Sequence, residues 1–397
     1  MLFSKSGKKG EDKSEIMEIF AYSNKRKAEI GDENVFDFSI GNPSIRAPKQ
    51  VDDTIIDLIK NVDSVSLHGY TTPAGRGEVL ETLAKSIRER YNTPCEKENL
   101  YITCGAAASL SISLKALIKK GQEVILLAPY FPEYTAYLEN AGAKVREVLC
   151  ERKTFGIDLT ALEKAINKKT RVVIVNSPNN PTGVIYSEQN IKDLAALLER
   201  KQKKFGTKIT IIADEPYREL CYDDNAVPFI PCFYDNTIVC YSYSKSLSIP
   251  GERIGYLFVS PKMQDAKQTY NEICKSARGM GYICAPTLLQ RVIAECNDIR
   301  PDLSKYDENR KMLYNAITDI GYEAVMPQGA FYLFVKALED DAKEFCKKAR
   351  KYELLFVPSD SFGVKGYVRI AYCVSKSQIE NSISAFEKLY KEYAKEK

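Results

Sequence analysis

The segment SYSKSLSIPGERIG, residues 242–255, carries the residue types best suited to chemistry. It begins where the apolar run TIVCYS ends, and that run predicts a strand buried on both faces. Lys245 therefore follows the carboxyl end of a strand, where open α/β sheets form their binding crevice, and a buried neutral amine there can attack an aldehyde. Ser242, Ser244 and Arg253 supply hydroxyl groups and a fixed charge that suit a phosphate. The alternative is a serine-rich loop with a solvated lysine.

An acidic residue and a tyrosine follow a second predicted strand, in IIADEPYREL. Asp214 ends that apolar run, and a buried carboxylate is costly unless it has a cationic partner. A protonated pyridine nitrogen is one such partner, and the hydroxyl of Tyr217 could reach a phenolic oxygen on the same ring. The alternatives are a helix N-cap or turn residue for Asp214 and a packing aromatic for Tyr217.

Two segments that follow predicted strands offer amide groups to a ligand. In NSPNNPTG, residues 176–183, prolines flank paired asparagines and hold the amide of Asn180 in a rigid turn, which could equally be only a turn. In TCGAAASLSISLKAL, a strand leads through Gly105 into a helix whose small first residues, Ala106 and Ala107, leave backbone N–H groups open to an anion. The alternative for this second segment is an ordinary close-packed turn.

Near the C-terminus, GYVRIAYCV predicts a strand in which Tyr367, Arg369 and Ala371 share one face. A planar guanidinium binds a carboxylate through two parallel hydrogen bonds and so fixes the orientation of the bound molecule. Lysine at this position would keep the charge but lose the fork geometry. The alternative is a surface arginine paired with a glutamate.

These segments require a scaffold that brings several strand ends together. Between about residues 100 and 260, short apolar runs alternate with segments of helical period, which predicts a doubly wound α/β core with a mainly parallel sheet. Beyond residue 290, the pattern of helix, strand and helix predicts a smaller α+β lobe. The expected parts are residues 1–47 as an N-terminal arm with part of the small domain, 48–290 as the large domain, and 291–397 as the small C-terminal domain.

The same patterns predict individual elements. An amphipathic helix is expected from about Ser14 to Ile30. In SEQNIKDLAALLERKQKK, Ser187 can cap the N-terminus of a helix and Gly206 can end it. The runs that predict strands are YITC, EVILLA, RVVIVNS, KITIIAD, TIVCYS, RIGYLFV, GAFYLFVKA and GYVRIAYCV.

Composition narrows the class of protein. Hydrophobic residues at 44%, charged residues at 28% and a net charge of +4 describe a globular chain without a preference for nucleic acid or a membrane surface. His68 is the only histidine, which excludes a His-rich metal site, and we expect it to be structural. The eleven scattered cysteines are interpreted as reduced thiols. No apolar stretch has the pattern of a secretory signal or a membrane span, so a cytoplasmic location is expected.

Five separated motifs occur along the chain in one order: FSIGNP, CGAAASL, NNPTG, DEPY with the SKS lysine segment, and GYVRIAY. In this order they resemble the class I and II aminotransferases, the fold-type I enzymes typified by aspartate aminotransferase, from about residue 35 to the C-terminus. The resemblance implies pyridoxal 5′-phosphate as cofactor, bound by the large doubly wound domain. It also implies a ping-pong transfer of the amino group of an L-amino acid to a 2-oxo acid, with 2-oxoglutarate as the expected acceptor.

The resemblance implies a role for each candidate around the cofactor. Lys245 would carry the cofactor as a Schiff base and shuttle the substrate proton, while Asp214 would keep the pyridine nitrogen protonated. Tyr217 and Asn180 would bind the phenolic oxygen, and Phe131, in APYFPEY, would stack on the ring where many relatives have tryptophan. The residues implied to bind the phosphate are Gly105, Ala106, Ala107, Ser242, Ser244 and Arg253.

Substrate and partner contacts follow from the same resemblance. Arg369, Asn180 and Gly41 of the FSIGNP turn would bind the α-carboxylate of the substrate. Tyr70, in HGYTTPAG, would cross to the phosphate of a neighbouring subunit, which implies a homodimer with shared active sites; the alternative is a surface-loop aromatic. Arg278 would bind a side-chain carboxylate or lie at a dimer interface, so specificity for aspartate or glutamate is only one candidate.

Two other functions remain open on the sequence. A pyridoxal-phosphate lyase, such as a cysteine-conjugate β-lyase or an aminocyclopropane-carboxylate-synthase-like enzyme, would use the same cofactor residues. A non-enzymatic regulator fused to a DNA-binding domain is disfavoured, because the segment before residue 35 is too short for a winged helix and lacks a basic recognition helix.

Overall fold

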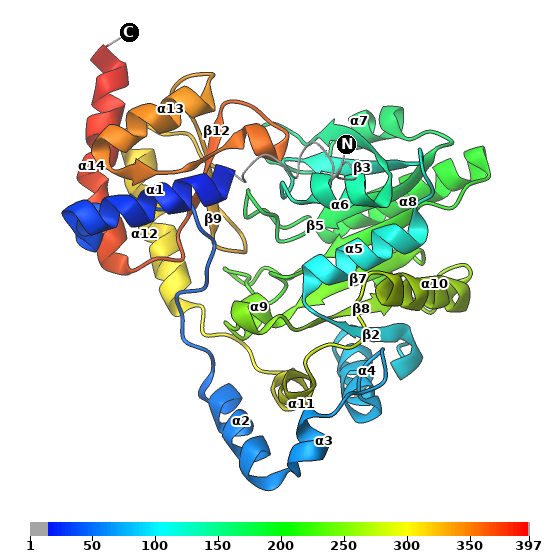
Figure 1. Ribbon diagram of the computed structural model, residues 1–397. Coiled ribbons are helices and arrows are strands. Elements are labelled where there is room, and N and C mark those ends of the chain that lie inside the picture. The colour runs from blue at the N-terminus through cyan, green and yellow to red at the C-terminus, as the bar shows by residue number, and fades with distance from the viewer. Residues whose placement is uncertain (1–14, 396–397) are drawn as a thin grey trace, which may run out of the picture.

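A seven-stranded sheet forms the centre of the computed structural model, which describes residues 15–395 (Figure 1). The strand order is β2-β8-β7-β6-β5-β3-β4, and only β8 runs antiparallel to its neighbours. The predicted α/β fold with a mainly parallel sheet is therefore confirmed. The strands are β2 (Leu100–Thr103), β3 (Glu123–Ala128), β4 (Lys144–Leu149), β5 (Thr170–Asn176), β6 (Thr210–Asp214), β7 (Thr237–Ser242) and β8 (Gly255–Val259).

Helices cover both faces of this sheet (Figure 1). Apolar side chains of α5 (Ala106–Leu117), α6 (Tyr134–Ala141) and α10 (Ala266–Gly279) pack in one core cluster with side chains from one face. A second core cluster lies on the other face and extends to the helices at the bottom of the view. The helices of that second cluster are α2 (Lys49–Asn61), α4 (Gly77–Tyr91), α7 (Leu159–Ala165), α8 (Glu188–Phe205) and α11 (Thr287–Cys296), and the short α3 (Ser64–His68) follows α2.

Strand β7 shows why the sheet places functional groups at its carboxyl edge. All six of its residues are buried, and successive residues such as Cys240 and Tyr241 pack into the clusters on opposite faces. A strand buried on both faces is apolar throughout rather than alternating. The chain then enters the short helix α9 (Tyr243–Ser246), whose first turn is capped by Ser242 Oγ accepting from the Ser244 N–H at 3.3 Å. This turn presents Lys245 at the edge of the sheet.

Helix α8 has the termini that the sequence predicts. Ser187 Oγ accepts a hydrogen bond from the Asn190 N–H at 3.1 Å at the first turn. Gly206 follows the last turn with a φ of 62°, the left-handed conformation that favours glycine. Both helix-ending signals are confirmed.

Strand β4 is not among the predicted strands. Its sequence KVREVL leaves all but one of its six residues exposed, and it lies at the edge of the sheet, paired with β3. Charged side chains are common on edge strands, where they oppose pairing with other chains. An edge strand of this kind contains no continuous apolar run, which was the pattern used to predict the others.

A smaller unit lies beside the large sheet, on the left of Figure 1. It contains an antiparallel sheet of order β11-β12-β9 and a short parallel pair, β1 and β10, that joins the N-terminal and C-terminal parts of the chain. Its strands are β1 (Phe36–Asp37), β9 (Tyr332–Lys336), β10 (Leu354–Leu355), β11 (Val357–Pro358) and β12 (Tyr367–Ala371). Its helices are α1 (Glu15–Ile30), α12 (Ser304–Ile320), α13 (Ala342–Ala349) and α14 (Lys376–Lys395).

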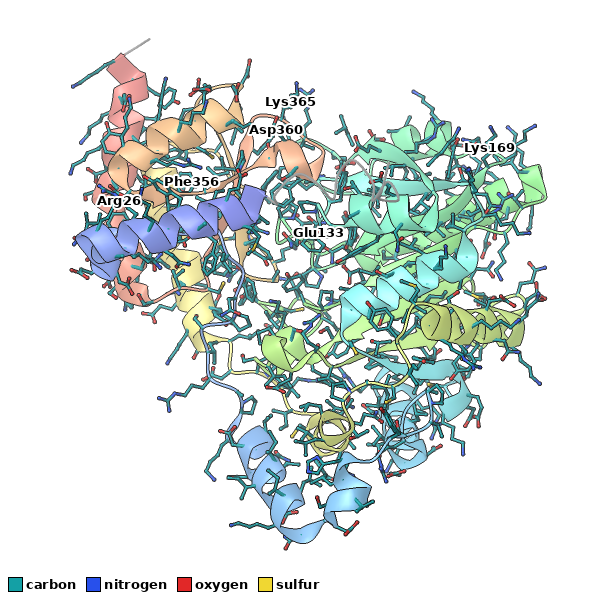
Figure 2. All side chains as sticks on the ribbon, viewed as in Figure 1. Arg26, Glu133, Lys169, Phe356, Asp360 and Lys365 are labelled. Carbon is teal, nitrogen blue, oxygen red and sulfur yellow. The ribbon has the colours of Figure 1, made fainter. Side chains whose placement is uncertain are left out.

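Helix α1 packs along this smaller unit. Arg26, labelled in Figure 2, forms an ion pair with Glu353 at 2.7 Å between Nη2 and Oε1. The predicted N-terminal helix is confirmed up to its expected end at Ile30. Its expected first residue, Ser14, and the rest of the expected arm before it lie outside the described residues.

A cleft runs between the two units. Glu133 lines it on the side of the large sheet, and Asp360 and Lys365 line it on the side of the smaller unit (Figure 2). One backbone hydrogen bond joins the two units here, from the Tyr130 N–H to the carbonyl oxygen of Phe362 at 3.0 Å. The two units therefore meet next to the carboxyl edge of the sheet.

All eleven cysteines are free, as the sequence predicts. Within residues 15–395, no group of three or more His, Cys, Asp or Glu side chains is arranged to hold a metal ion. None of the helices in the same range is both long enough and apolar enough to cross a membrane.

Candidate active site

Lys245 lies at the carboxyl edge of the large sheet, facing the smaller unit. Its Nζ donates to the carbonyl oxygen of Gly41 at 2.9 Å and lies 5.3 Å from the ring centre of Phe331. Burial, partly offset by Cys373 and reinforced by the positive charges of Arg253 and Arg369, lowers the pKa of this amine to about 8. Near neutral pH a useful fraction of the amine is therefore uncharged, which is its nucleophilic form.

Asp214, the last residue of β6, has a fully buried carboxylate with one free oxygen. Its Oδ2 accepts a hydrogen bond from the hydroxyl of Tyr134, whereas its Oδ1 has no partner among the described residues. Burial, partly offset by the hydrogen bond from Tyr134 and reinforced by the charge of Glu215, raises the pKa of this carboxyl to about 7. A buried, unpaired carboxylate oxygen requires a cationic donor, and a protonated ring nitrogen fits that requirement.

The hydroxyl group of Tyr217 is hydrogen-bonded to that of a second buried tyrosine, Tyr332. The hydroxyl oxygens of Tyr217 and Tyr332 lie 2.9 Å apart. Burial raises the pKa of Tyr217 well above its usual value, so the hydroxyl keeps its proton and can donate. A Cβ added to Gly41 would overlap the hydroxyl of Tyr332, so the close approach of this backbone requires glycine.

Hydroxyl groups and a guanidinium gather at the end of β7. The Oγ atoms of Ser242 and Ser244 lie 2.8 Å apart, and Arg253 Nη1 donates to Ser244 Oγ at 3.5 Å. Several donors and one fixed charge converge there, as phosphate recognition requires.

The first turn of α5 completes this group of donors. Gly105 has a φ of 84°, and a Cβ there would lie only 2.9 Å from Arg253 Nη2. The first intrahelical bond begins at Ala108, so the N–H groups of Ala106 and Ala107 are those that a helix leaves without an intrahelical acceptor. Glycine lets this helix N-terminus approach the arginine closely, and the combination suits an anion.

Arg369, on β12, is only 2% exposed, so the alternative of a surface arginine is wrong. Its Nη2 donates to the carbonyl oxygen of Ser39 at 2.6 Å, and its Nη1 donates to Asn180 Oδ1 at 3.1 Å. The rings of Tyr332 and Phe362 lie 4.6 Å and 5.3 Å from the guanidinium carbon. Its Nε has no partner among the described residues, so this buried guanidinium can still donate to a carboxylate.

Three other candidates differ in where they lie. Phe131 lies next to the residues around Asp214, because its ring packs at a right angle to that of Tyr134, with 5.6 Å between ring centres and an interplanar angle of 85°. Tyr70 is 94% exposed on the segment after α3. Arg278 is exposed in the last turn of α10. Within one chain, Tyr70 and Arg278 are therefore not brought to the buried residues of the site.

Two tyrosines of the site were missed by the sequence analysis. Tyr134 bonds Asp214 across 80 residues of sequence, and Tyr332 bonds Tyr217 across 115. Both lie in segments that had been singled out for other reasons, APYFPEY and GAFYLFVKA. Its position three residues after Phe131, at the start of a helix, was the only signal that could have pointed to Tyr134. Nothing in that segment indicates that Tyr134 bonds Asp214.

Comparison with known sequences gives a consistent family. The family model described as aminotransferase class I and II matches residues 33–386. A probable aspartate aminotransferase of Methanocaldococcus jannaschii is 30% identical over 387 residues, which cover 95% of this chain and 97% of that protein. An aspartate aminotransferase of Thermotoga maritima is 29% identical over 361 residues, which cover 89% of this chain and 91% of that protein.

Solved structures that resemble this chain are also aminotransferases. The crystal structure of an amino transferase from Eubacterium rectale is 51% identical, with a TM-score of 0.97 and 99% of both chains covered. The aspartate aminotransferase of Thermotoga maritima is 27% identical, with a TM-score of 0.86 and coverage of 97% of this chain and 99% of the other.

These relatives are named aminotransferases, so the lyase alternative is not favoured. The resemblance noted in the five sequence motifs is confirmed over nearly the whole chain. The residues around Lys245 and Asp214 also fit the aldehyde and the ring nitrogen of the cofactor that this family uses. The chain thus belongs to the class I and II aminotransferases, enzymes that transfer amino groups between small molecules with pyridoxal 5′-phosphate.

Proposed function

We propose that this aminotransferase moves the amino group of an L-amino acid to a 2-oxo acid, with 2-oxoglutarate as acceptor, in two half-reactions at one site. The observation that carries the proposal is a shared backbone segment. Lys245 Nζ donates to the Gly41 carbonyl at 2.9 Å, and Arg369 Nη2 donates to the Ser39 carbonyl at 2.6 Å. An amine and a carboxylate-binding fork that are hydrogen-bonded to carbonyl groups two residues apart suit an α-amino acid, whose amino and carboxylate groups are attached to the same carbon.

The bound cofactor supplies an aldehyde and a ring that accepts electrons. We assign its covalent attachment to Lys245, and we assign to the same amine the transfer of a proton between Cα of the substrate and C4′ of the cofactor. The pKa of about 8 suits this second task, because a general base works best when its pKa lies near the working pH.

The remaining ring contacts are assigned to three side chains. Asp214 Oδ1 would hold the proton on the ring nitrogen, and the Tyr217 hydroxyl would donate to the phenolic oxygen. Asn180 would donate to the same oxygen through Nδ2, since its Oδ1 already accepts from Arg369 at 3.1 Å. Arg369 therefore fixes which way the Asn180 amide points.

Both anionic ends are assigned to the donor groups described above. The phosphate would lie among Ser242, Ser244, Arg253 and the first turn of α5, supported by their convergence at the end of β7. The substrate carboxylate would bind Arg369, with Asn180 and Gly41 beside it.

A half-reaction assay tests this function. Enzyme loaded with pyridoxal phosphate is mixed with single amino acids in the absence of an oxo acid, and the visible spectrum of the cofactor is followed. L-Aspartate is the first donor to test, because several relatives are named aspartate aminotransferase. Restoration of the spectrum by 2-oxoglutarate is the expected second step, and D-aspartate is the control. Failure of every L-amino acid to change the spectrum would reject the proposal.

We also propose the domain division expected from the sequence: 1–47 as an arm with part of the small domain, 48–290 as the large domain, and 291–397 as the small domain. Its support is that the core of the smaller unit gathers residues from Phe38 and from the C-terminal third, including Phe386. We make one adjustment to this division: because α11 (Thr287–Cys296) spans residue 290 and packs with α2 and α4, we propose that the large domain ends after Cys296 instead of at residue 290. A cytoplasmic location is likewise proposed, with the eleven free cysteines as its support.

A homodimer with shared active sites is the proposed assembly. Its support is a group of exposed apolar side chains on α2, α3 and neighbouring segments, since exposed apolar patches mark interaction surfaces. These side chains are Ile56, Ile59, Val65, Tyr70 and Ile283.

Hybrid dimers are expected to show the sharing directly. Tyr70→Ala should weaken the cofactor contact from the partner, and Lys245→Ala should remove the attachment point, so each variant alone is expected to be nearly inactive. Mixed dimers would hold one site with both residues intact, and an equal mixture should recover about a quarter of wild-type activity. The measurement is activity after co-expression, with the two variants mixed without subunit exchange as control. No recovery in isolated hybrids would contradict shared sites.

Asp214→Asn is expected to stabilise the cofactor-free protein as the pH rises. The folded-state pKa of Asp214 is raised to about 7 from 3.8, so wild-type protein loses stability between these values while the unfolded chain releases its proton. Relative to wild type, the free energy of unfolding of Asp214→Asn should rise by up to about 4 kcal/mol from pH 4 to above pH 7. Urea unfolding at several pH values measures this, with the exposed Asp319→Asn as control. A difference that does not vary with pH would contradict the burial of an unpaired carboxylate.

A further inference from the structure

Tyr134, the first residue of α6, connects two of the proposed cofactor contacts. Its hydroxyl donates to Asp214 Oδ2, and its ring lies edge-on against Phe131 at 5.6 Å between centres. The side chain is buried and comes from a helix that packs on the same face of the sheet as α5. One residue therefore touches both the carboxylate assigned to the ring nitrogen and the ring assigned to the cofactor face.

The direction of the hydrogen bond follows from the chemistry of the two groups. An ionised carboxylate only accepts, and burial raises the pKa of Tyr134 well above its usual value, so the hydroxyl keeps its proton and donates. With Oδ2 held in this way, rotation of the carboxylate is restricted. Oδ1, the atom without a partner among the described residues, then points in one defined direction.

The other titratable groups around Asp214 do not stabilise its ionised form. Glu215 tends to raise its pKa, and that carboxylate is itself turned to Arg218 at 2.5 Å. Burial raises the pKa of each tyrosine and cysteine beside Asp214, so these side chains are uncharged near neutral pH. The titratable groups that face Asp214 are Tyr134 and Tyr137 of α6, Glu215 and Tyr217 after β6, and Cys240 of β7.

We propose that Tyr134 is a positioning residue that orients the carboxylate of Asp214 toward the ring nitrogen of the cofactor and keeps it ionised. The inference rests on the proposed role of Asp214. Its physical basis is that a hydrogen bond to a buried carboxylate favours the charged form, and only the charged form attracts a protonated ring nitrogen.

Tyr134→Phe tests the inference, because it removes the hydroxyl and keeps the ring against Phe131. The dissociation constant of pyridoxal 5′-phosphate is measured for the apoprotein from pH 6 to pH 8.5 by absorbance and fluorescence titration. We expect binding about tenfold weaker at pH 7, and the pH below which affinity declines should move upward by about one unit. A variant with unchanged affinity and an unchanged pH profile would overturn the proposal.

Two further sets of variants distinguish the proposed role of Tyr134 from the proposed role of Asp214. Tyr186→Phe also removes a fully buried hydroxyl, one that lies 3.8 Å from Cys150 Sγ, and should leave cofactor binding and its pH profile unchanged. If Asp214→Asn weakens binding and Tyr134→Phe does not, the inference alone fails; if neither does, the proposed role of Asp214 fails. The double variant should bind no more weakly than Asp214→Asn, since Tyr134 acts through that carboxylate. An additive loss would mean that Tyr134 acts in another way and would also overturn the proposal.

Discussion

Lys245→Ala is expected to lower turnover by at least about 10⁴-fold, the upper range of what one positioned acid–base group contributes. The variant loses both the amine that would join the cofactor and the group that would move the substrate proton. The visible absorbance of the lysine-bound cofactor measures the loss of attachment, and borohydride reduction followed by peptide mapping should find no pyridoxyl group at residue 245. Steady-state rates measure the loss of the group that would move the substrate proton.

A matched control is available in Lys208, another lysine whose pKa is lowered by burial. It donates to the backbone carbonyl of Gln264 and precedes β6, whose other end carries Asp214, so Lys208→Ala should retain wild-type rates and absorbance. Lysine-bound absorbance that persists in Lys245→Ala would place the attachment elsewhere and would reject the assignment on which the mechanism depends.

Arg369→Lys is expected to lower kcat/KM for the amino acid by about 10²-fold, and Arg369→Ala by about 10³-fold. Lysine keeps one charge but cannot form two parallel hydrogen bonds with the carboxylate, whereas alanine loses both. The cofactor absorbance should remain in both variants, because Arg369 is not assigned to cofactor attachment. Half-reaction rates against amino-acid concentration provide the measurement.

Substrates without a carboxylate give this prediction a sharper form. Wild-type enzyme should strongly prefer an L-amino acid to the amine that remains when its carboxylate is removed. In Arg369→Ala that preference should nearly disappear, since the lost contact is with the carboxylate alone. A preference that stays at the wild-type value would show that another residue binds the carboxylate.

The sequence predicts the residues that stand at the ends of strands. Asp214 and Lys245 each follow a run that is apolar throughout, and parallel strands align their carboxyl ends at one edge of a sheet. Their arrival near one another therefore follows from local patterns and the fold class. Arg369 was found because β12 has an alternating face in an otherwise apolar run.

Contacts made by packing could not be read in the same way. Tyr134 reaches Asp214 only because α6 packs at a particular place on the sheet. The position of a helix relative to a strand cannot be predicted from the sequence of either segment. Tyr332 reaches its partners through the register of β9 with β12, in which Ala371 lies opposite Tyr332. Strand β4 was missed for a different reason, since its exposed polar residues resemble a loop.

The backbone from Ser39 to Gly41 holds two side chains that come from different parts of the molecule. The guanidinium of Arg369 on β12 and the amine of Lys245 on α9 both donate hydrogen bonds to carbonyl oxygens of this short segment. An insertion of even one residue there would shift the two groups relative to each other without disturbing either sheet. Loop grafting aimed at new substrates should therefore leave the length of this segment unchanged and vary its neighbours.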